Sequence, residues 1–179
     1  MKEQQKKYEL TGEFIEHWSG KKLYRIKALV SFGVVVAGQL GGFIESEKNL
    51  DQSLSGNAWV YGDARVSGDA EVSGDAEVYG DARVYGDARV YGNARVRSYA
   101  VIYERKMIFW ASNVGSENGT LTVFNGRDGL IVTRGCFTGT VDEFLAKSAE
   151  VHDDKTKNEY KLLIEVAKSR ILGVKDERN

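Results

Sequence analysis

The chain has 179 residues, of which 42% are hydrophobic and 11% aromatic, and its formal net charge is -1. This composition favours one folded core with small appendages, and it excludes both a disordered acidic chain and a strongly basic nucleic-acid binder. A single cysteine excludes a disulfide framework within the chain and favours a reducing cytoplasm. The first residues lead into no apolar run of signal-peptide or membrane length, so we expect no membrane partner.

Residues 1–53 are predicted to form a β-rich N-terminal cap. Residues 8–16 and 23–30 have the composition of short strands, and the turn-rich residues 17–20 between them are typical of a hairpin. A glycine-containing run at 38–45 then leads into the next region. Because the end of a strand stack exposes unpaired backbone groups, we expect this region to cover one end of such a stack.

A six-residue phrase recurs between residues 54 and 107, for example VYGDAR at 60–65. An aliphatic residue opens each copy and alanine usually stands fifth, while glycine followed by Asp or Asn marks a turn at positions three and four. The nine copies begin at Leu54, Val60, Val66, Val72, Val78, Val84, Val90, Val96 and Ile102. A helix would scatter these aliphatic residues around its surface, since six residues advance it by about 1.7 turns. The period therefore predicts a solenoid of short stacked β-segments.

Residues 108–179 are predicted to form a small α+β C-terminal module. Its strands are expected around residues 108–110, 121–124 and 130–133, with a hairpin loop at 125–129. The periodicity then becomes helical, and the sequence predicts two helices at the end of the module.

Two capping boxes are predicted to begin these helices, one formed by Thr140 with Glu143 and the other by Thr156 with Glu159. Gly173 is predicted to end the second helix. The apolar residues expected to line the helices are Phe144, Leu145 and Ala149 in the first and Tyr160, Leu163, Ile164, Ala167 and Ile171 in the second.

The repeated phrase resembles the hexapeptide repeat of left-handed parallel β-helices, in which a small residue follows an aliphatic one four positions later. The resemblance implies three copies per triangular coil, hence about three coils, and a left hand. We therefore expect a mainly β fold: a short left-handed parallel β-helix with a β-rich N-terminal cap and a small α+β C-terminal module ending in two helices.

The flanking segments are similar to modules of hexapeptide-repeat proteins from bacteriophages and prophages. The similar segments are YRIKA at 24–28, GGFIESE at 41–47, NL at 49–50, GNAWV at 56–60, RGCF at 134–137 and EF at 143–144. This resemblance implies a phage setting and a fold, and it implies no reaction.

No catalytic residue is predicted. Many hexapeptide-repeat proteins are acyltransferases that use a histidine base in or beside the coils, whereas this chain has no histidine between His17 and His152. We interpret His17 as a residue of the hairpin turn and His152 as a residue at the end of the first helix. Cys136 follows Arg134 and precedes a helix, but no base is predicted beside it, so we expect a small buried residue there.

Neither a metal nor a cofactor is predicted. Aspartate recurs at position four of the phrase, which is a pattern that calcium-binding repeats also use. Those repeats have a nine-residue period with paired turns, so we interpret these aspartates as turn residues. The residues concerned are Asp63, Asp69, Asp75, Asp81 and Asp87.

An 18-residue coil places residues that are 18 apart on adjacent rungs, about 4.8 Å from each other. Glu77 then lies next to Arg95, and Glu71 lies next to Arg89. Two faces of the prism are therefore predicted to carry pairs of opposite charge, which stabilise the stack modestly.

The third face is predicted to carry a column of like charge, Arg65 next to Arg83, together with an aromatic column of Tyr61 on Tyr79 beneath Arg97. This combination suits an anionic aromatic ligand such as a nucleotide, because arginine binds phosphate oxygens and tyrosine stacks on a base. The predicted ligand-binding residues are Arg65, Arg83, Arg97, Tyr61, Tyr79, Arg127 and Arg134. Two alternatives stay open for this face: the corner aspartates Asp63 and Asp81 neutralise its arginines, or a second subunit covers it.

The expected function is that of a non-catalytic phage-type binding protein in the host cytoplasm, acting against host defence by sequestering a nucleotide-type signal or blocking a defence protein. The alternatives are an acyltransferase-like enzyme and a purely structural or assembly protein. A homotrimer is expected, because prisms of this family commonly pack around a threefold axis.

Overall fold

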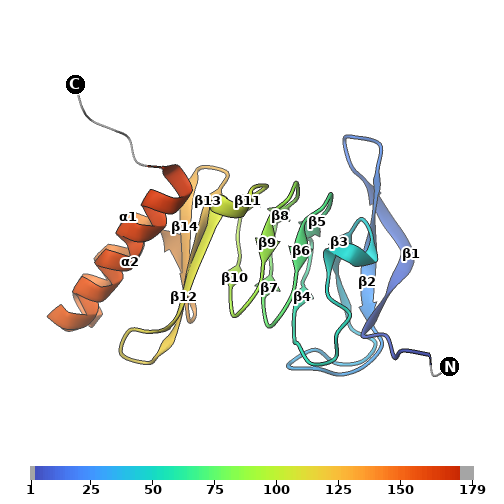
Figure 1. Ribbon diagram of the computed structural model, residues 1–179, viewed down its shortest axis with the longest axis horizontal. Coiled ribbons are helices and arrows are strands. Elements are labelled where there is room, and N and C mark those ends of the chain that lie inside the picture. Colours follow the sequence, from blue (N-terminus) through green and yellow to red (C-terminus); the bar gives the residue numbers. More distant parts are fainter. Residues whose placement is uncertain (1–2, 174–179) are drawn as a thin grey trace.

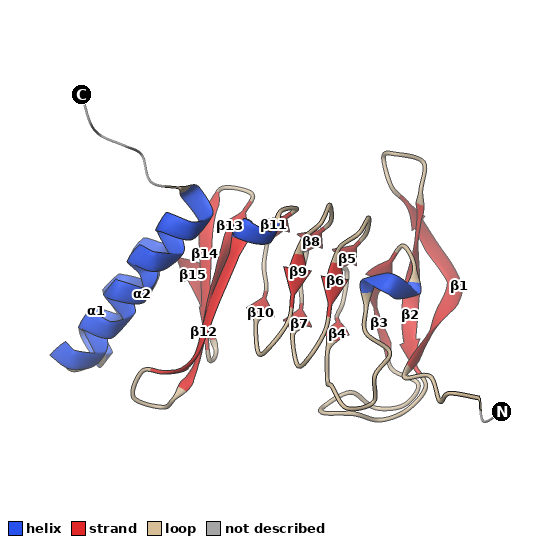
Figure 2. Cartoon of the chain, viewed as in Figure 1, coloured by secondary structure: helices blue, strands red, loops and turns tan. Residues whose placement is uncertain are grey.

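The computed structural model describes residues 3–173 and shows three parts in a row, with the β-solenoid in the middle (Figure 1). A strand-rich region lies at the N-terminal end of the solenoid, and a sheet backed by two helices lies at the other end (Figure 2). The predicted mainly β fold, with about three coils and two C-terminal helices, is confirmed.

The N-terminal region is an antiparallel sheet that continues into the solenoid. Strands β1 (Tyr8–Glu16) and β2 (Lys22–Ala28) form the predicted hairpin, and β3 (Leu40–Ile44) pairs with β2. The 3-10 turn η1 (Glu47–Asn49) follows. Strand β3 also pairs in parallel with the first strand of a coil face, so the antiparallel sheet and this face form one six-stranded sheet.

Eight two-residue strands build the coils. They are β4 (Trp59–Val60), β5 (Arg65–Val66), β6 (Glu71–Val72), β7 (Glu77–Val78), β8 (Arg83–Val84), β9 (Arg89–Val90), β10 (Arg95–Val96) and β11 (Val101–Ile102). They pair in parallel on three faces: face 1 (β4, β7, β10), face 2 (β5, β8, β11) and face 3 (β6, β9). The pairing of Arg65 with Arg83 confirms the 18-residue coil.

The repeat forms these coils because its apolar positions face the interior of the solenoid and its glycine positions form the turns. The opening aliphatic residue and the fifth-position alanine point inward, and from Ala58 to Ile102 these residues are at most 1% exposed. The turn glycines adopt a positive φ, for example 59° at Gly62 and 63° at Gly86, which L-residues adopt only at a cost. The stack begins before residue 54, since Phe43 pairs with Arg65 and Leu50 bridges to Val72.

Side chains from the cap satisfy backbone groups at the first coil. The buried Lys7 ammonium donates to the carbonyl oxygens of Ala58 at 3.1 Å and Gly56 at 3.4 Å. The Asn49 amide donates in the same way to the carbonyl oxygen of Ala70 at 2.9 Å. Buried carbonyls without a donor would each destabilise the fold, so these contacts fix the cap on the end of the stack. Burial lowers the pKa of Lys7, and the nearby Asp51 carboxylate partly opposes this.

The C-terminal module closes the opposite end in a similar manner. The Arg95 backbone N–H donates to the Thr122 hydroxyl at 3.1 Å, and the Thr133 hydroxyl donates to the Arg95 carbonyl at 2.7 Å. The Asn125 amide donates to the Val101 carbonyl oxygen at 3.0 Å. The sheet of this module therefore acts as a lid on the last coil.

The module comprises the 3-10 turn η2 (Arg105–Met107), an antiparallel sheet and two helices. The sheet contains β12 (Ile108–Val114), β13 (Gly119–Gly126), β14 (Gly129–Arg134) and β15 (Phe137–Thr140), and the helices are α1 (Val141–Val151) and α2 (Asp154–Leu172). Side chains of β13 alternate between two cores, since Phe124 packs with the solenoid interior whereas Leu121 and Val123 pack with the helices. Within residues 3–173, neither helix has the length and apolar character that a transmembrane span needs.

Several local predictions for this module are wrong. The second capping box is absent, because Asp153 caps α2 by accepting from the Thr156 N–H at 2.8 Å while Thr156 is itself buried. In α1, Ser148 faces the core and Ala149 is exposed, since the helix is rotated relative to the expected pattern. Cys136 is exposed rather than buried, because it lies in the turn between β14 and β15, a strand that the sequence analysis missed.

We expect Tyr8→Phe to lower the free energy of unfolding at neutral pH by about 1–3 kcal/mol, because a buried acceptor loses its donor. The Tyr8 hydroxyl donates to the Leu50 carbonyl oxygen at 2.6 Å. Burial raises the pKa of Tyr8, with Glu47 and Asp51 adding to the effect.

Above about pH 10 the unfolded chain loses the Tyr8 proton and the folded chain keeps it, so the stabilising contribution of Tyr8 is complete below that pH and declines above it. The difference between wild type and Tyr8→Phe should therefore narrow on the alkaline side. Urea unfolding at neutral and alkaline pH measures this difference in the free energy of unfolding. A difference that stays constant with pH would contradict the prediction.

Candidate functional site

Face 2 of the solenoid carries two arginines on adjacent rungs. Arg65 and Arg83 are direct partners in the parallel pairing of β5 and β8, and Val101 of β11 continues the column. Among residues 3–173, no carboxylate forms an ion pair with either guanidinium: Asp63 lies 3.9 Å from the Arg25 guanidinium instead, and Asp81 forms no ion pair. The arginine column is therefore positively charged, and the corner aspartates do not neutralise it through ion pairs.

The β1–β2 hairpin leans over this column and forms a pocket with it. The cavity has a volume of about 360 Å³, and we call it the hairpin pocket. Its polar and aromatic lining consists of Glu16, His17, Trp18, Arg65, Ser67, Arg83 and Tyr85. Trp18 is 91% exposed and Tyr85 is 37% exposed, so both rings are open to a ligand. Two arginines beside two accessible aromatic rings suit an anion that carries an aromatic group.

The two histidines occupy different ends of the molecule. His17 lies in the hairpin turn, where its Nδ1 is 2.7 Å from the Ser19 hydroxyl and its ring is 5.2 Å from the Trp18 ring. His152 follows α1, with its Nδ1 3.1 Å from the Ser148 hydroxyl. His17 alone therefore joins the pocket.

The aromatic column forms with the predicted stacking, but it lies beside face 1 rather than with the arginine column. The Tyr61 and Tyr79 rings are 4.2 Å apart and nearly parallel, and the Arg97 guanidinium lies 5.5 Å from the Tyr79 ring. The Tyr79 hydroxyl donates to Glu77 at 2.6 Å. Burial, followed by the Glu77 carboxylate, raises the pKa of Tyr79, which keeps this hydroxyl protonated. The adjacent Glu77–Arg95 ion pair, at 3.3 Å, is the predicted cross-rung pair.

The remaining predicted residues have structural contacts elsewhere. The Arg97 guanidinium donates to the Gly135 carbonyl oxygen at 3.1 Å, which joins the solenoid to the C-terminal module. The Arg127 guanidinium lies 4.2 Å from the Tyr99 ring. The largely buried Arg134 donates to the Tyr160 hydroxyl at 2.9 Å.

The structure thus does not bring the seven predicted residues into one site: Arg65 and Arg83 stay together on face 2, and Tyr61, Tyr79 and Arg97 stay together beside face 1. Sequence reasoning missed Trp18 as a partner of this column. The available signal was a tryptophan in a polar hairpin turn, where no core can bury it.

The corner aspartates act as turn and ladder residues. The Asp75 carboxylate accepts from the Asn57 N–H of the previous rung at 3.1 Å, and the Asp69 carboxylate pairs with Lys48 at 3.0 Å. Within residues 3–173, no group of three or more His, Cys, Asp or Glu side chains is arranged to hold a metal ion.

These observations define a β-solenoid repeat protein whose two ends are closed by other structural elements. In agreement with this class, the family model described as YdcK Beta solenoid repeat matches residues 76–90 and 88–104, which lie in the later coils. No curated protein matches the chain significantly.

Proposed function

We propose that the chain is a non-catalytic binding protein for an anionic aromatic molecule of the nucleotide type, and that the hairpin pocket is its site. The observation that carries this proposal is the pairing of Arg65 with Arg83 on adjacent rungs, without an ion-pair partner among the described residues, beside Trp18 and Tyr85. The pocket volume of about 360 Å³ is in the range of small-molecule sites.

The pocket has a polarity that orients such a ligand. The guanidinium groups of Arg65 and Arg83 offer forked donors to phosphate oxygens. The Trp18 and Tyr85 rings offer surfaces for a base. The Glu16 carboxylate lines the same cavity and repels phosphate, so the phosphate is directed to the arginine side.

We expect Arg83→Ala to weaken nucleotide binding by about 1.5–3 kcal/mol, the contribution of a hydrogen bond to a charged group. The side chain of Arg83 is exposed, so the fold should be unaffected. Calorimetry with cyclic nucleotides and ADP-ribose measures the effect. The matched control is Arg127→Ala, which removes the same charge from an exposed side chain outside both this pocket and the other cavities of the described residues.

Equal effects of Arg83→Ala and Arg127→Ala would show that the pocket is not the site. Absence of nucleotide binding to the wild type would instead favour a protein partner or a structural role.

The proposed biological setting is an infected bacterial cell, in which the protein sequesters a defence signal or blocks a defence protein. This part rests on the resemblance of the flanking segments to phage and prophage proteins, together with the arginine column. Mass spectrometry of small molecules released from protein purified out of phage-infected, defence-active cells tests it directly.

We also propose a homotrimer, because Tyr85, Tyr91, Tyr99 and Tyr103 leave apolar area exposed along the coils.

An acyltransferase-like enzyme is the second candidate, and one observation favours it. His17 lines the hairpin pocket, so a histidine does stand beside the coils. Turnover of an acyl-CoA with an amine or hydroxyl acceptor, abolished by His17→Ala, would support the enzyme over the binding protein.

A further inference from the structure

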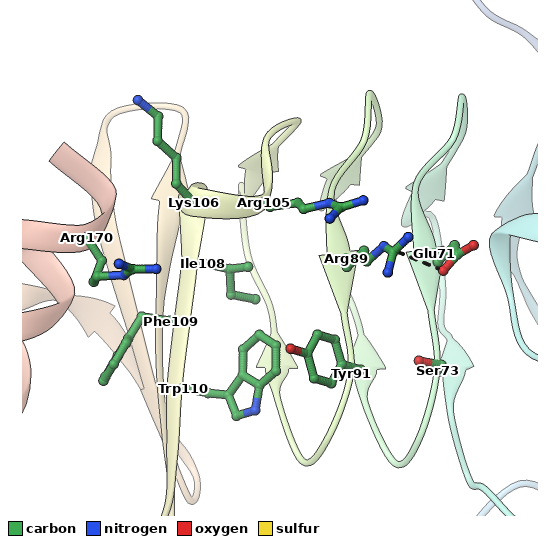
Figure 3. A pocket seen from close by; sticks show the side chains of 10 residues that line it. All are labelled: Glu71, Ser73, Arg89, Tyr91, Arg105, Lys106, Ile108, Phe109, Trp110 and Arg170. Carbon is green, nitrogen blue, oxygen red and sulfur yellow. Dashed lines mark ion pairs between the residues drawn. The ribbon is translucent and has the colours of Figure 1, made fainter. Parts of the chain in front are cut away.

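A second and larger cavity lies between face 3 and the C-terminal module. It has a volume of about 730 Å³, twice that of the hairpin pocket, and shares none of that pocket's residues. We call it the basic cleft; its charged and aromatic lining includes Arg89, Arg105, Lys106, Arg170, Tyr91 and Trp110 (Figure 3). The sequence analysis assigned it no function.

The cations of the cleft come from three separate elements. Arg89 belongs to β9, Arg105 and Lys106 to η2, and Arg170 to the last turn of α2. Figure 3 shows Arg89 and Arg105 on the solenoid side of β12, and the Arg170 side chain extending from α2 toward β12 on the other side. Three arginines therefore line one cavity although their elements are far apart in the sequence, whereas the Lys106 ammonium points away from them.

The lining contains one carboxylate, that of Glu71, and it offsets little of this charge. The Arg89 Nε is 3.8 Å from the Glu71 carboxylate, and both side chains are about half exposed (49% and 53%). Exposed ion pairs of this kind contribute about 0–1 kcal/mol, so Arg89 can exchange Glu71 for a ligand. Arg105 and Arg170 have no ion-pair partner among residues 3–173.

Two aromatic rings, those of Tyr91 and Trp110, line the same cavity as these cations. The Tyr91 and Trp110 rings meet edge to face at 4.6 Å, and Tyr91 is 52% exposed. The Trp110 Nε1 is held against Gly92, where a Cβ atom would approach it to 2.9 Å. The Trp110 ring is thus fixed in place, and the Tyr91 ring that packs against it remains accessible.

We propose that the basic cleft binds the linked phosphates of a diphosphate or triphosphate. A single phosphate group is too small to meet cations that three elements place around a cavity of this size, whereas a phosphate chain spreads its negative charge over several of them. The phosphate chain can be free or can belong to a nucleotide whose base meets Tyr91. This site is independent of the function proposed for the hairpin pocket.

Calorimetry of the full chain with sodium tripolyphosphate, ATP and AMP at low ionic strength tests the site. We expect saturable binding of tripolyphosphate and ATP, and at least about tenfold weaker binding of AMP. Tighter binding of ATP than of tripolyphosphate that persists in Arg83→Ala, where the hairpin pocket is weakened, identifies a nucleotide whose base meets Tyr91, and equal binding identifies the phosphate chain alone. Both results support the proposed site.

Substitutions locate the site. Arg105→Ala and Arg170→Ala should each weaken tripolyphosphate binding about tenfold or more, with the conservative Arg105→Gln and Arg170→Gln used if an alanine variant misfolds. Lys106→Ala is the matched control, because the Lys106 ammonium points away from the other cations in Figure 3 and pairs with Glu104 at 3.7 Å. Arg127→Ala, which removes an exposed arginine outside both cavities, should leave tripolyphosphate binding unchanged.

Each cavity also contains its own tryptophan, which gives a site-specific signal. The fluorescence change caused by tripolyphosphate should persist in Trp18→Phe and disappear in Trp110→Phe. Three results would overturn the proposal: no saturable binding of tripolyphosphate or ATP, equal weakening by Lys106→Ala and Arg105→Ala, or a fluorescence change that depends on Trp18 alone.

Discussion

Trp59→Ala is expected to lower the free energy of unfolding by about 3–5 kcal/mol, the range for removing a large aromatic side chain from a core. Trp59 is fully buried at the start of the first regular coil. Its ring lies 6.1 Å from the Tyr8 ring and 5.3 Å from the Phe32 ring, both edge to face. The substitution therefore opens a cavity between the cap and the solenoid and weakens the contact that holds them together.

Urea unfolding followed by circular dichroism measures this effect. Trp18→Ala is the matched control, because Trp18 is 91% exposed and its loss should change stability by less than about 0.5 kcal/mol. Trp59→Phe should recover most of the loss, since it restores the ring and removes an indole N–H that has no partner among the described residues. A loss below about 1 kcal/mol in Trp59→Ala would contradict this role.

Gly86→Ala is expected to cost about 2–5 kcal/mol, because it combines left-handed strain of about 1–2 kcal/mol with overpacking of about 1–3 kcal/mol. Gly86 has a φ of 63°, and a Cβ atom there would collide with the carbonyl oxygen of Tyr103 on the next rung. The backbone at Tyr103 cannot move aside without disturbing the pairing of the coils.

Gly62→Ala separates the two contributions. Gly62 has a similar φ of 59°, but nothing lies within 4 Å of the Cβ position, so only the strain of about 1–2 kcal/mol should remain. Ser98 adopts a φ of 61° at the corresponding position of the last coil, where no further coil is stacked above it. Equal losses of stability in the two alanine variants would show that close stacking of the turns is unimportant.

The hexapeptide period by itself determined the solenoid, its 18-residue coil and its interior. These features depend on local information, because the same short phrase specifies an inward aliphatic residue, an inward alanine and a turn glycine in every copy. Cross-rung neighbours follow directly from the period, which is why the Glu77–Arg95 pair and the Tyr61–Tyr79 stack were predictable.

Only the tertiary structure decided which side chains share a face and how the ends of the stack are closed. The period places residues along the solenoid axis, but it does not say that the corner tyrosines lean toward Glu77 on face 1, away from Arg65. The contacts of Lys7 with Ala58 and of Thr122 with Arg95 join residues without any common pattern in the sequence. The same holds for Trp18 and Arg83, which line one cavity, and for Arg170 and Arg105, which line another, because both cavities form where elements distant in the sequence pack against the coils.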